Sequence, residues 1–338
     1  MESEAVYFLA NIIFMANISL TTYCNRNCSF CFARNVRNNV CPNMSVSTFI
    51  RAVDFFKAGG LDTIHLMGGE PTLHPKFPFL VEKILERRLN IQIFTGGVIA
   101  DSLLDALDAS SLASDNLNFI LNVDLTHSSN DMLLHHQEAL CQRLSKKITL
   151  GATILHAAQD LSRLIDWHNR WHTAPAIRLG VAHPIAKGGN RFVREPQLFN
   201  VGALAERFCR KAIEGGIHIE FDCGWTPCMF SSFFMENSPF ASQIGQRCNP
   251  IIDVLPNGSI APCYALSHIN DKKLQNKETR DNMVAHFETE LEPWREIGSK
   301  TDCTTCAYRN NGICRGGCVA RAMTRGMHPQ HKRADNQF

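Results

Sequence analysis

The sequence lacks an excess of charge of either sign. Its 34 basic and 32 acidic side chains nearly cancel and leave a net charge of +2. Nucleic acids and anionic membranes are bound through clustered positive charge, so this balance gives no electrostatic case for either partner. The sequence also lacks a long apolar run of the kind that forms a transmembrane helix. The apolar stretch at residues 6–20 lacks a basic region before it, which argues against a signal peptide.

Internal repeats and low-complexity segments are missing as well. With 45% hydrophobic and 20% charged residues, the composition is that of a globular protein. The length of 338 residues suits a barrel with an added domain. Cysteine, by contrast, is abundant. The 14 cysteines cluster in C-x2-C and C-x3-C spacings, which favour metal or iron–sulfur ligation in a reducing compartment, here the cytoplasm, over disulfides.

One cysteine group lies near the start of the chain, where Cys24, Cys28 and Cys31 have the spacing C-x3-C-x2-C. Three thiolates in one tight loop can hold three irons of a [4Fe–4S] cube. The fourth iron then has no protein ligand nearby and can chelate a small molecule, for which S-adenosylmethionine is the candidate. The alternatives are coincidence or part of a zinc site, although zinc sites usually add a second cysteine pair further along the chain.

A second motif, Met67-Gly68-Gly69-Glu70-Pro71-Thr72, follows a strand-like apolar run. Neither glycine has a Cβ, so the backbone can approach a ligand closely there. Glu70 can accept a hydrogen bond from an ammonium group. Alone, the motif fits an ordinary turn between a strand and a helix. Because it ends the strand that follows the cysteine loop, we expect both motifs to serve one site.

Strand-like and helical segments alternate from residue 17 to about residue 222. The sequence predicts strands at 18–22, 63–67, 91–94, 119–123, 148–155 and 176–181, and helices at 46–57, 77–88, 101–109, 131–146, 161–171 and 201–213. Ser45 is the predicted N-cap of the first helix, and Gly59 lies near its end. Such a series implies a parallel sheet with helices outside it.

Six strands are too few for a closed eight-stranded barrel. We therefore expect an α/β fold with a partial (β/α)6 barrel at residues 1–222 and a small cysteine-rich α+β domain at residues 223–338. Ligand sites in such barrels lie at the carboxyl ends of the strands. Both motifs, Asp124 and residues 180–183 should therefore face the same mouth.

The two motifs resemble the signatures of the radical SAM superfamily, including the aromatic Phe30 before the third cysteine. The resemblance implies a radical [4Fe–4S] cluster on Cys24, Cys28 and Cys31. It implies that Gly68, Gly69 and Glu70 hold the amino group of S-adenosylmethionine. It also implies reductive cleavage of that cofactor to a 5′-deoxyadenosyl radical, which abstracts a substrate hydrogen.

Further residues at the mouth could hold the rest of the cofactor. Asp124 could bind a ribose hydroxyl or could equally be a capping or loop carboxylate. Gly180 and Val181 could contact the adenine through their backbone. His183 could be a catalytic base for the substrate, although a hydrogen-bonded structural histidine is the favoured alternative. We interpret residues 187–191 as a solvated turn, with an anion-binding loop as the alternative.

Eight more cysteines lie between residues 223 and 318, namely Cys223, Cys228, Cys248, Cys263, Cys303, Cys306, Cys314 and Cys318. Two cubes with four thiolates each would use all eight. The spacing resembles the SPASM domain, a C-terminal extension of many radical SAM peptide-modifying enzymes that carries two auxiliary [4Fe–4S] clusters. The resemblance implies one cluster on Cys248, Cys263, Cys318 and an upstream cysteine, and another on Cys303, Cys306, Cys314 and a later cysteine.

The chain departs from that pattern, because no cysteine follows Cys318 and the gap from Cys306 to Cys314 is long. We therefore predict that Cys223 and Cys228 join one cluster each. The alternative is a shortened, twitch-like domain with one cluster and a zinc site, since zinc also favours thiolates.

Auxiliary clusters imply electron transfer and a net oxidation. The favoured function is formation of a cross-link in a ribosomally made peptide, with flavodoxin or ferredoxin as the external electron donor. The alternatives are a dehydrogenase or maturase acting on a small molecule or a protein side chain and, remotely, a non-enzymatic electron carrier. Only 23 residues precede Cys24, so we expect leader-peptide binding to need a separate protein.

Overall fold

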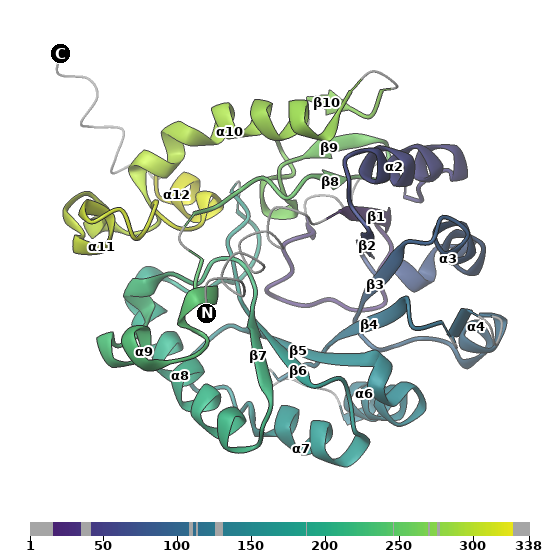
Figure 1. Ribbon diagram of the computed structural model, residues 1–338, viewed down its shortest axis with the longest axis horizontal. Coiled ribbons are helices and arrows are strands. Elements are labelled where there is room, and N and C mark those ends of the chain that lie inside the picture. The colour runs from purple at the N-terminus through teal and green to yellow at the C-terminus, as the bar shows by residue number, and fades with distance from the viewer. Residues whose placement is uncertain are drawn as a thin grey trace.

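A computed structural model describes residues 16–34, 42–107, 111–112, 114–125, 131–186, 188–245, 247–269, 271–275 and 278–326. Seven consecutive strands pair in parallel to form a curved sheet (Figure 1). They are β1 (Asn17–Thr21), β2 (Thr63–Gly68), β3 (Asn90–Thr95), β4 (Leu117–Asn122), β5 (Ile148–Ile154), β6 (Ala176–Val181) and β7 (His218–Phe221). The six predicted strands are confirmed, and β7 adds a seventh.

Helices cover the outer face of this sheet (Figure 1). They are α2 (Val46–Ala58), α3 (Phe77–Leu85), α4 (Asp101–Ala106), α6 (Asp131–Leu144), α7 (Ser162–Trp171) and α8 (Leu198–Glu214). The predicted cap of α2 is confirmed, because the Ser45 side chain accepts a hydrogen bond from the Thr48 amide. The predicted end of the third helix at residue 109 lies outside the described residues.

The strands show why the helices pack on one face only. Along β6, the buried residues Ile177 and Leu179 alternate with the half-buried residues Arg178 and Gly180. Because successive side chains of a strand point to opposite faces, the apolar set meets the helices and the other set faces the inside of the barrel. The inner face is therefore partly polar, and the main apolar core lies between the sheet and the helices.

Residues after β7 extend the same sheet beyond β1. Strand β8 (Asp253–Val254) pairs in parallel with β1, and β9 (Ser259–Ala261) and β10 (Lys272–Lys273) follow in antiparallel. A buried hydrogen bond of 2.7 Å from Asn17 Nδ2 to Asp253 Oδ1 reinforces the contact between β1 and β8. The division into residues 1–222 and 223–338 stays a prediction; the predicted boundary falls directly after β7.

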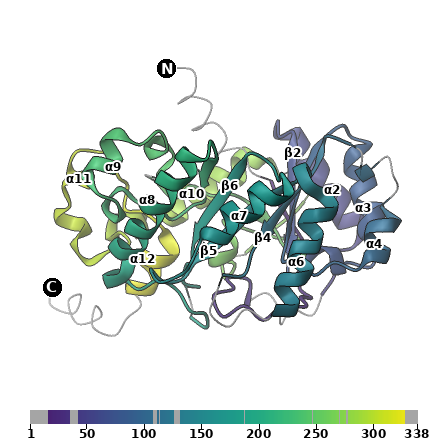
Figure 2. The same cartoon turned by 90° about the horizontal axis from the view of Figure 1, so that it is seen from below.

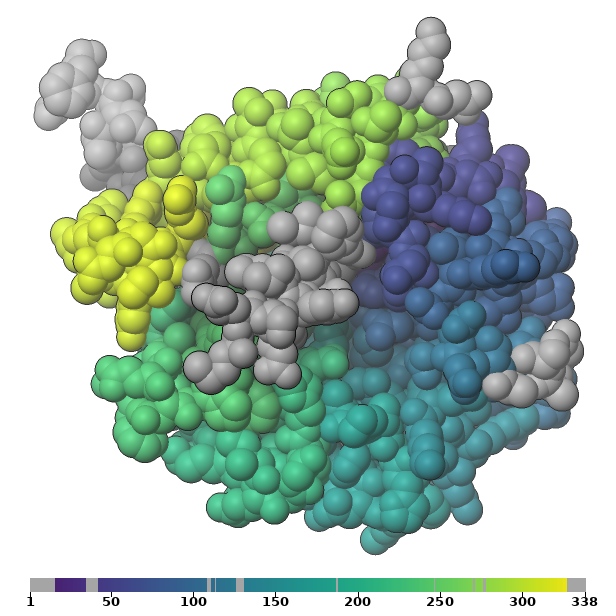
Figure 3. All heavy atoms as spheres, in the orientation of Figure 1, coloured from purple at the N-terminus to yellow at the C-terminus, as the bar shows by residue number. Residues whose placement is uncertain are grey.

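The remaining C-terminal elements are mainly helical: α9 (Ser232–Asn237), α10 (Arg280–Ile297), α11 (Ala307–Asn310) and α12 (Val319–Gly326). Figure 2 shows α9, α11 and α12 gathered with α8 at one end of the molecule, away from α3 and α4. The start of α10 borders α2, where Gly59 packs against Arg280, as the adjoining purple and yellow-green surfaces of Figure 3 show. In the described part of the chain, every helix is too short or too polar to cross a membrane.

Candidate cofactor and cluster site

The loop from Cys24 to Cys31 leaves the carboxyl end of β1. The Cys31 amide donates a hydrogen bond of 3.2 Å to the Cys28 carbonyl, which turns the loop back on itself. Burial raises the pKa of the Cys28 thiol; the Arg26 guanidinium opposes this shift, and the neighbouring Cys31 and Cys24 thiols add to it. The three predicted ligands therefore lie close enough together to interact electrostatically.

The strand-two motif packs directly against the start of this loop. The Gly69 and Glu70 amides each donate a hydrogen bond of 2.7 Å, to the Thr21 and Tyr23 carbonyls respectively. A Cβ added at Gly69 would lie 2.0 Å from the Tyr23 carbonyl oxygen, and one at Gly68, whose φ is +146°, would lie 2.4 Å from the Thr21 oxygen. Glycine is therefore required here by contact with the protein's own cysteine loop.

The Glu70 carboxylate is only 1% exposed and is engaged by protein groups. Its Oε2 accepts hydrogen bonds from the Gly96 amide at 2.8 Å and from Thr95 Oγ1 at 3.1 Å, and its Oε1 accepts one from Thr72 Oγ1 at 2.8 Å. Burial raises the pKa of Glu70, and these hydrogen bonds act against that shift. The carboxylate thus ties the end of β2 to the end of β3, and its predicted contact with an ammonium group stays a prediction.

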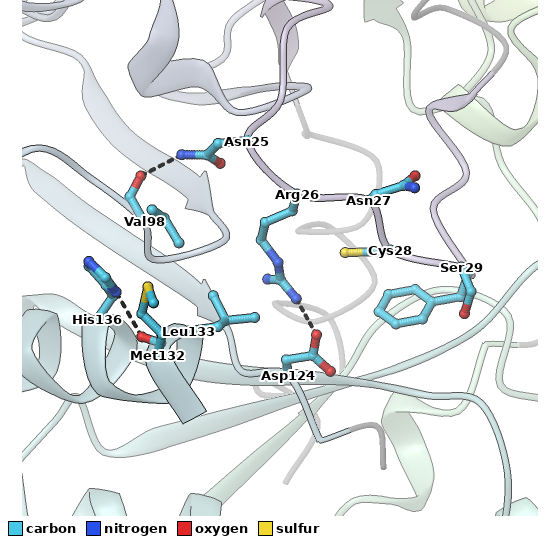
Figure 4. Close-up of a pocket in the computed structure, with 11 residues that line it drawn as sticks. Asn25, Arg26, Asn27, Cys28, Ser29, Val98, Asp124, Met132, Leu133 and His136 are labelled. Atoms are coloured by element: carbon cyan, nitrogen blue, oxygen red, sulfur yellow. Dashed lines mark hydrogen bonds and ion pairs between the residues drawn. The ribbon is translucent and has the colours of Figure 1, made fainter. Parts of the chain in front are cut away.

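Arg26 connects the cysteine loop to β3 and β4 (Figure 4). Its Nη2 lies 2.8 Å from Asp124 Oδ2, and its Nη1 donates to the carbonyls of Gly96 at 3.3 Å and Asn122 at 3.2 Å. A Cβ on Gly96 would lie 2.5 Å from Arg26 Cδ, so glycine makes room for this side chain. The predicted ribose ligand Asp124 is therefore paired with an arginine from the cluster loop.

Gln137 of α6 bonds to the same two carbonyl groups as Arg26. Its side chain is fully buried, and its Nε2 donates to the same Gly96 and Asn122 carbonyls at 2.8 and 2.9 Å. Its Oε1 accepts a hydrogen bond of 3.2 Å from the Asp124 amide. Two side chains that are distant in sequence, Arg26 and Gln137, thus hold the carboxyl ends of β3 and β4 together next to the cysteine loop.

A cavity of about 400 Å³ opens beside the loop. Residues 25–30 form one wall, and Val98, Asp124 and the α6 residues Met132, Leu133 and His136 form the other. Figure 4 shows Arg26 reaching across this space to Asp124, with Cys28 beside it. The volume lies within the range of small-molecule and cofactor pockets, and the mixture of apolar and polar lining groups is typical of them.

The other predicted cofactor residues lie at the end of β6. The Val181 side chain is buried in the core, so only its backbone can face a ligand. Gly180 lies on the inner face, where an added Cβ would approach Asp222 Oδ2 at 3.6 Å. Contacts of these two residues with adenine stay predictions.

His183 lies beside Cys223, one of the eight C-terminal cysteines, and its role as a structural histidine or a catalytic base stays a prediction. It is 9% exposed, and its Nε2 donates to the Cys223 carbonyl at 2.9 Å. Burial would raise the pKa of Cys318, but His183 and Arg321 outweigh it and lower that pKa to about 6.

The four cysteines Cys223, Cys248, Cys263 and Cys318 form the first group. Burial and then repulsion by the Cys318 thiol raise the pKa of Cys248 to about 12. Burial raises the pKa of Cys263 far above its usual value, with Cys248 and Cys318 among the contributing neighbours. Cys223 is an exposed residue, yet burial of its sulfur, the neighbouring Asp222 carboxylate and the Cys318, Cys263 and Cys248 thiols raise its pKa well above the usual value. Arg295 fixes the group from outside by donating from Nε and Nη2 to the Cys248 carbonyl, at 3.0 and 2.8 Å.

The four cysteines Cys228, Cys303, Cys306 and Cys314 form the second group and line one small cavity. The Lys300 amide donates to Cys303 Sγ at 3.3 Å, and Thr226 Oγ1 lies 3.3 Å from Cys228 Sγ. Hydrogen bonds to sulfur are typical surroundings of cluster ligands. The structure places Cys223 beside the first group and Cys228 beside the second; that each of them ligates one cluster stays a prediction.

In the described ranges, no three His, Cys, Asp or Glu side chains lie close enough together to hold one metal ion. Sequence reasoning missed Arg26, Gln137 and Arg321 as parts of the site, and it interpreted the segment that contains Asn190 as a solvated turn, whereas the Asn190 side chain bonds to Phe30, His183 and Ile185. Only Arg26 carried a signal, as a charged residue inside the cysteine loop. The other three act through hydrogen bonds between segments that are distant in sequence.

Three curated relatives resemble the chain at different lengths. GTP 3′,8-cyclase of Synechocystis is 26% identical over 46% of this chain and 50% of its own length. PqqA peptide cyclase of Gluconobacter oxydans is 24% identical over 90% of this chain and 85% of its own. The tungsten-containing aldehyde ferredoxin oxidoreductase cofactor-modifying protein of Pyrococcus furiosus is 29% identical over 87% of both chains. The chain thus matches about half of the first relative and most of the other two.

The solved structure of Streptococcus suis SuiB, bound to precursor peptide SuiA, superposes with a TM-score of 0.64 at 19% identity. It covers 94% of this chain and 75% of the SuiB chain, so the likeness of fold includes the cysteine-rich C-terminal region. This confirms the predicted fold class, a partial barrel followed by a cysteine-rich region of SPASM type. Residues 18–165, which contain both motifs, match the family model described as "Radical SAM superfamily", and this part of the chain is therefore identified as a radical SAM domain.

Proposed function

We propose that this radical SAM enzyme oxidatively modifies a ribosomally made peptide, forming a cross-link. The observation that carries the proposal is the relation to PqqA peptide cyclase over 90% of the chain, which extends well beyond residues 18–165. The likeness of fold to SuiB, a protein solved with its precursor peptide, supports the same substrate class. A cytoplasmic location, an electron donor such as flavodoxin or ferredoxin, and a separate leader-binding protein belong to this proposal.

The residues at the mouth fit a cluster and S-adenosylmethionine. Cys24, Cys28 and Cys31 supply three thiols in one loop, beside a cavity large enough for the cofactor. When bound, the cluster and the cofactor would supply an electron and then a 5′-deoxyadenosyl radical that abstracts a substrate hydrogen. The chain's own task is to fix the loop, which Gly69, Glu70 and Arg26 do through contacts with three strand ends.

The two C-terminal groups fit one auxiliary cube each, with four thiols per group. Full cysteine ligation leaves no iron open for a substrate. We therefore assign these clusters to electron transfer rather than to substrate binding.

The test is to incubate the anaerobically reconstituted protein with dithionite, S-adenosylmethionine and synthetic peptides encoded next to its gene. We expect formation of 5′-deoxyadenosine, stimulated by one peptide, and a peptide product that has lost hydrogen. Mass spectrometry and chromatography measure both. Cofactor cleavage with every peptide unchanged would contradict the peptide substrate.

The relation to the Pyrococcus cofactor-modifying protein favours a second candidate, oxidation of a small molecule. In that case the same assay would leave peptides intact and consume a small molecule from the surrounding pathway. Formation of 5′-deoxyadenosine is common to both candidates, so the identity of the altered substrate decides between them.

Arg26 offers a test of how the loop is fixed. We expect Arg26→Leu to slow 5′-deoxyadenosine formation about tenfold, because loss of an outer partner commonly costs 10–100-fold and the Asp124 carboxylate would lose its ion pair with Arg26. Adding Asp124→Asn should restore part of the rate, since it removes the carboxylate charge that has lost this ion pair. Arg143→Leu is the matched control, because Arg143 also pairs with aspartates, Asp101 and Asp105, but on the outer helices. Equal rates in Arg26→Leu and Arg143→Leu would show that the loop does not need Arg26.

A further inference from the structure

The segment that follows β6, described at residues 183–186 and 188–193, contacts both the cysteine loop and the first C-terminal cysteine group. On the loop side, Asn190 Nδ2 donates to the Phe30 carbonyl at 3.1 Å, and the Arg191 amide donates to the Ser29 carbonyl at 2.8 Å. Both acceptors lie between Cys28 and Cys31 in sequence. The segment therefore holds the part of the loop that carries two of its three cysteines.

The Asn190 side chain also holds the segment in shape. The same Nδ2 donates to the His183 carbonyl at 2.7 Å, and Oδ1 accepts a hydrogen bond of 3.0 Å from the Ile185 amide. Every hydrogen-bonding atom of this amide is thus in use. One side chain links the cysteine loop to the backbone of His183.

The other end of the segment meets the C-terminal group. The His183 ring donates from Nε2 to the Cys223 carbonyl and lies 3.8 Å from the Cys223 sulfur. Gly224 has a φ of +93°, and a Cβ there would lie 1.8 Å from His183 Cε1, so the ring is packed against this glycine. The Arg321 side chain, three residues after Cys318, donates to the Val193 carbonyl.

We propose that Asn190 and His183 are positioning residues that fix the radical-cluster loop relative to the first C-terminal cysteine group. The inference rests on the proposed function, since it assumes clusters in both places. Loss of an outer partner that orients a metal ligand commonly costs about 10–100-fold in metal affinity or activity. Here one continuous set of hydrogen bonds, from Phe30 through Asn190 and His183 to Cys223, sets the relation between two cluster sites that are about 200 residues apart in sequence.

The sharpest test is Asn190→Asp, which keeps the acceptor for the Ile185 amide and removes both donated hydrogen bonds. We expect the variant to keep its full iron content. On addition of S-adenosylmethionine, the EPR spectrum of its radical cluster should change differently from that of the wild type, and 5′-deoxyadenosine should form about tenfold more slowly. The matched control is Gln243→Glu. Gln243 is also an amide that donates to one carbonyl, of Ile219, and accepts from one amide, of Phe221, but it lies at the edge of β7.

A second pair of variants tests the other end. We expect His183→Ala to change the EPR signal of the first C-terminal cluster and His183→Gln to recover it, because glutamine can still donate to the Cys223 carbonyl. Recovery by glutamine separates hydrogen bonding from packing. A signal equally changed in both variants would assign only a packing role to His183.

The outcomes separate this inference from the proposed function. If the wild-type protein shows no EPR change on addition of S-adenosylmethionine, the proposed function fails. Suppose that the wild-type protein shows the EPR change. If Asn190→Asp then shows the same change in full and loses no more thermal stability than Gln243→Glu, the positioning role is overturned. The positioning role is supported if the EPR change of Asn190→Asp differs from that of the wild type while the EPR change of Gln243→Glu does not.

Discussion

Replacing Cys24, Cys28 and Cys31 together by alanine is expected to abolish reductive cleavage of S-adenosylmethionine while the C-terminal clusters survive. The full protein should hold about 12 irons, at four per cube, and the triple variant about eight. The physical reason is that the C-terminal groups take their eight thiols from residues 223–318 only. Iron analysis, together with the assay for 5′-deoxyadenosine, measures both parts of the result.

Cys141 and Cys209 provide the control for this experiment. Both are buried in helices of the outer layer, and burial raises the pKa of each thiol to about 12. Alanine at these positions should leave about 12 irons in place. Loss of all iron from the triple variant would show that the clusters depend on one another for assembly. About four irons with one zinc would support the twitch-like alternative.

The barrel could be predicted from sequence because its strands and helices differ locally in period. Along β3 and β6, buried and half-buried residues alternate strictly, and in β6 and in the first four residues of β3 the alternation of apolar and polar letters shows this pattern. The pairing of β8 with β1 was not predicted, because each strand contributes only two residues to it. Pairs this short have too little local pattern to be recognised.

The site was predicted in position but not in its contacts. The strand-two glycines were expected to admit a ligand, whereas the contacts in the structure are with the backbone of Thr21 and Tyr23. Asp124 was expected at the mouth and lies there, but its partner Arg26 comes from the cysteine loop. Contacts of this kind depend on the distance between strand ends, which follows from the curvature of the sheet. The sequence of one strand end alone therefore does not predict its partner on another.

The grouping of the C-terminal cysteines could likewise be predicted only in part from the sequence. Counting thiols predicted that Cys223 and Cys228 would separate, since each incomplete set needed one more ligand. The count could not say which cysteine joins which set. The folded neighbours of each cysteine make this assignment. Cys223 lies beside His183, just after β6, whereas Cys228 follows Thr226 and lines the same cavity as Ser299, Cys303 and Cys306.

Single replacements at Cys223 and Cys228 should therefore remove different clusters, although the two residues belong to one short loop. We expect Cys223→Ser to disturb the cluster formed with Cys248, Cys263 and Cys318, and Cys228→Ser to disturb the one formed with Cys303, Cys306 and Cys314. Each variant should lose up to about four irons, the content of one cube. The triple-alanine background isolates the C-terminal signals, so EPR spectra of the two variants in that background should be complementary.

The complementary pattern is what distinguishes two cysteine-ligated cubes from other arrangements. If both replacements removed the same signal, the separation of the two groups would be wrong. If neither changed a signal, the pair would not be ligating, and one cube would keep an open or non-cysteine site. Electron transfer could then no longer be assigned to that cube in preference to substrate binding, because an iron without a fourth protein ligand can bind a substrate directly, as the iron of the radical cluster is proposed to bind S-adenosylmethionine.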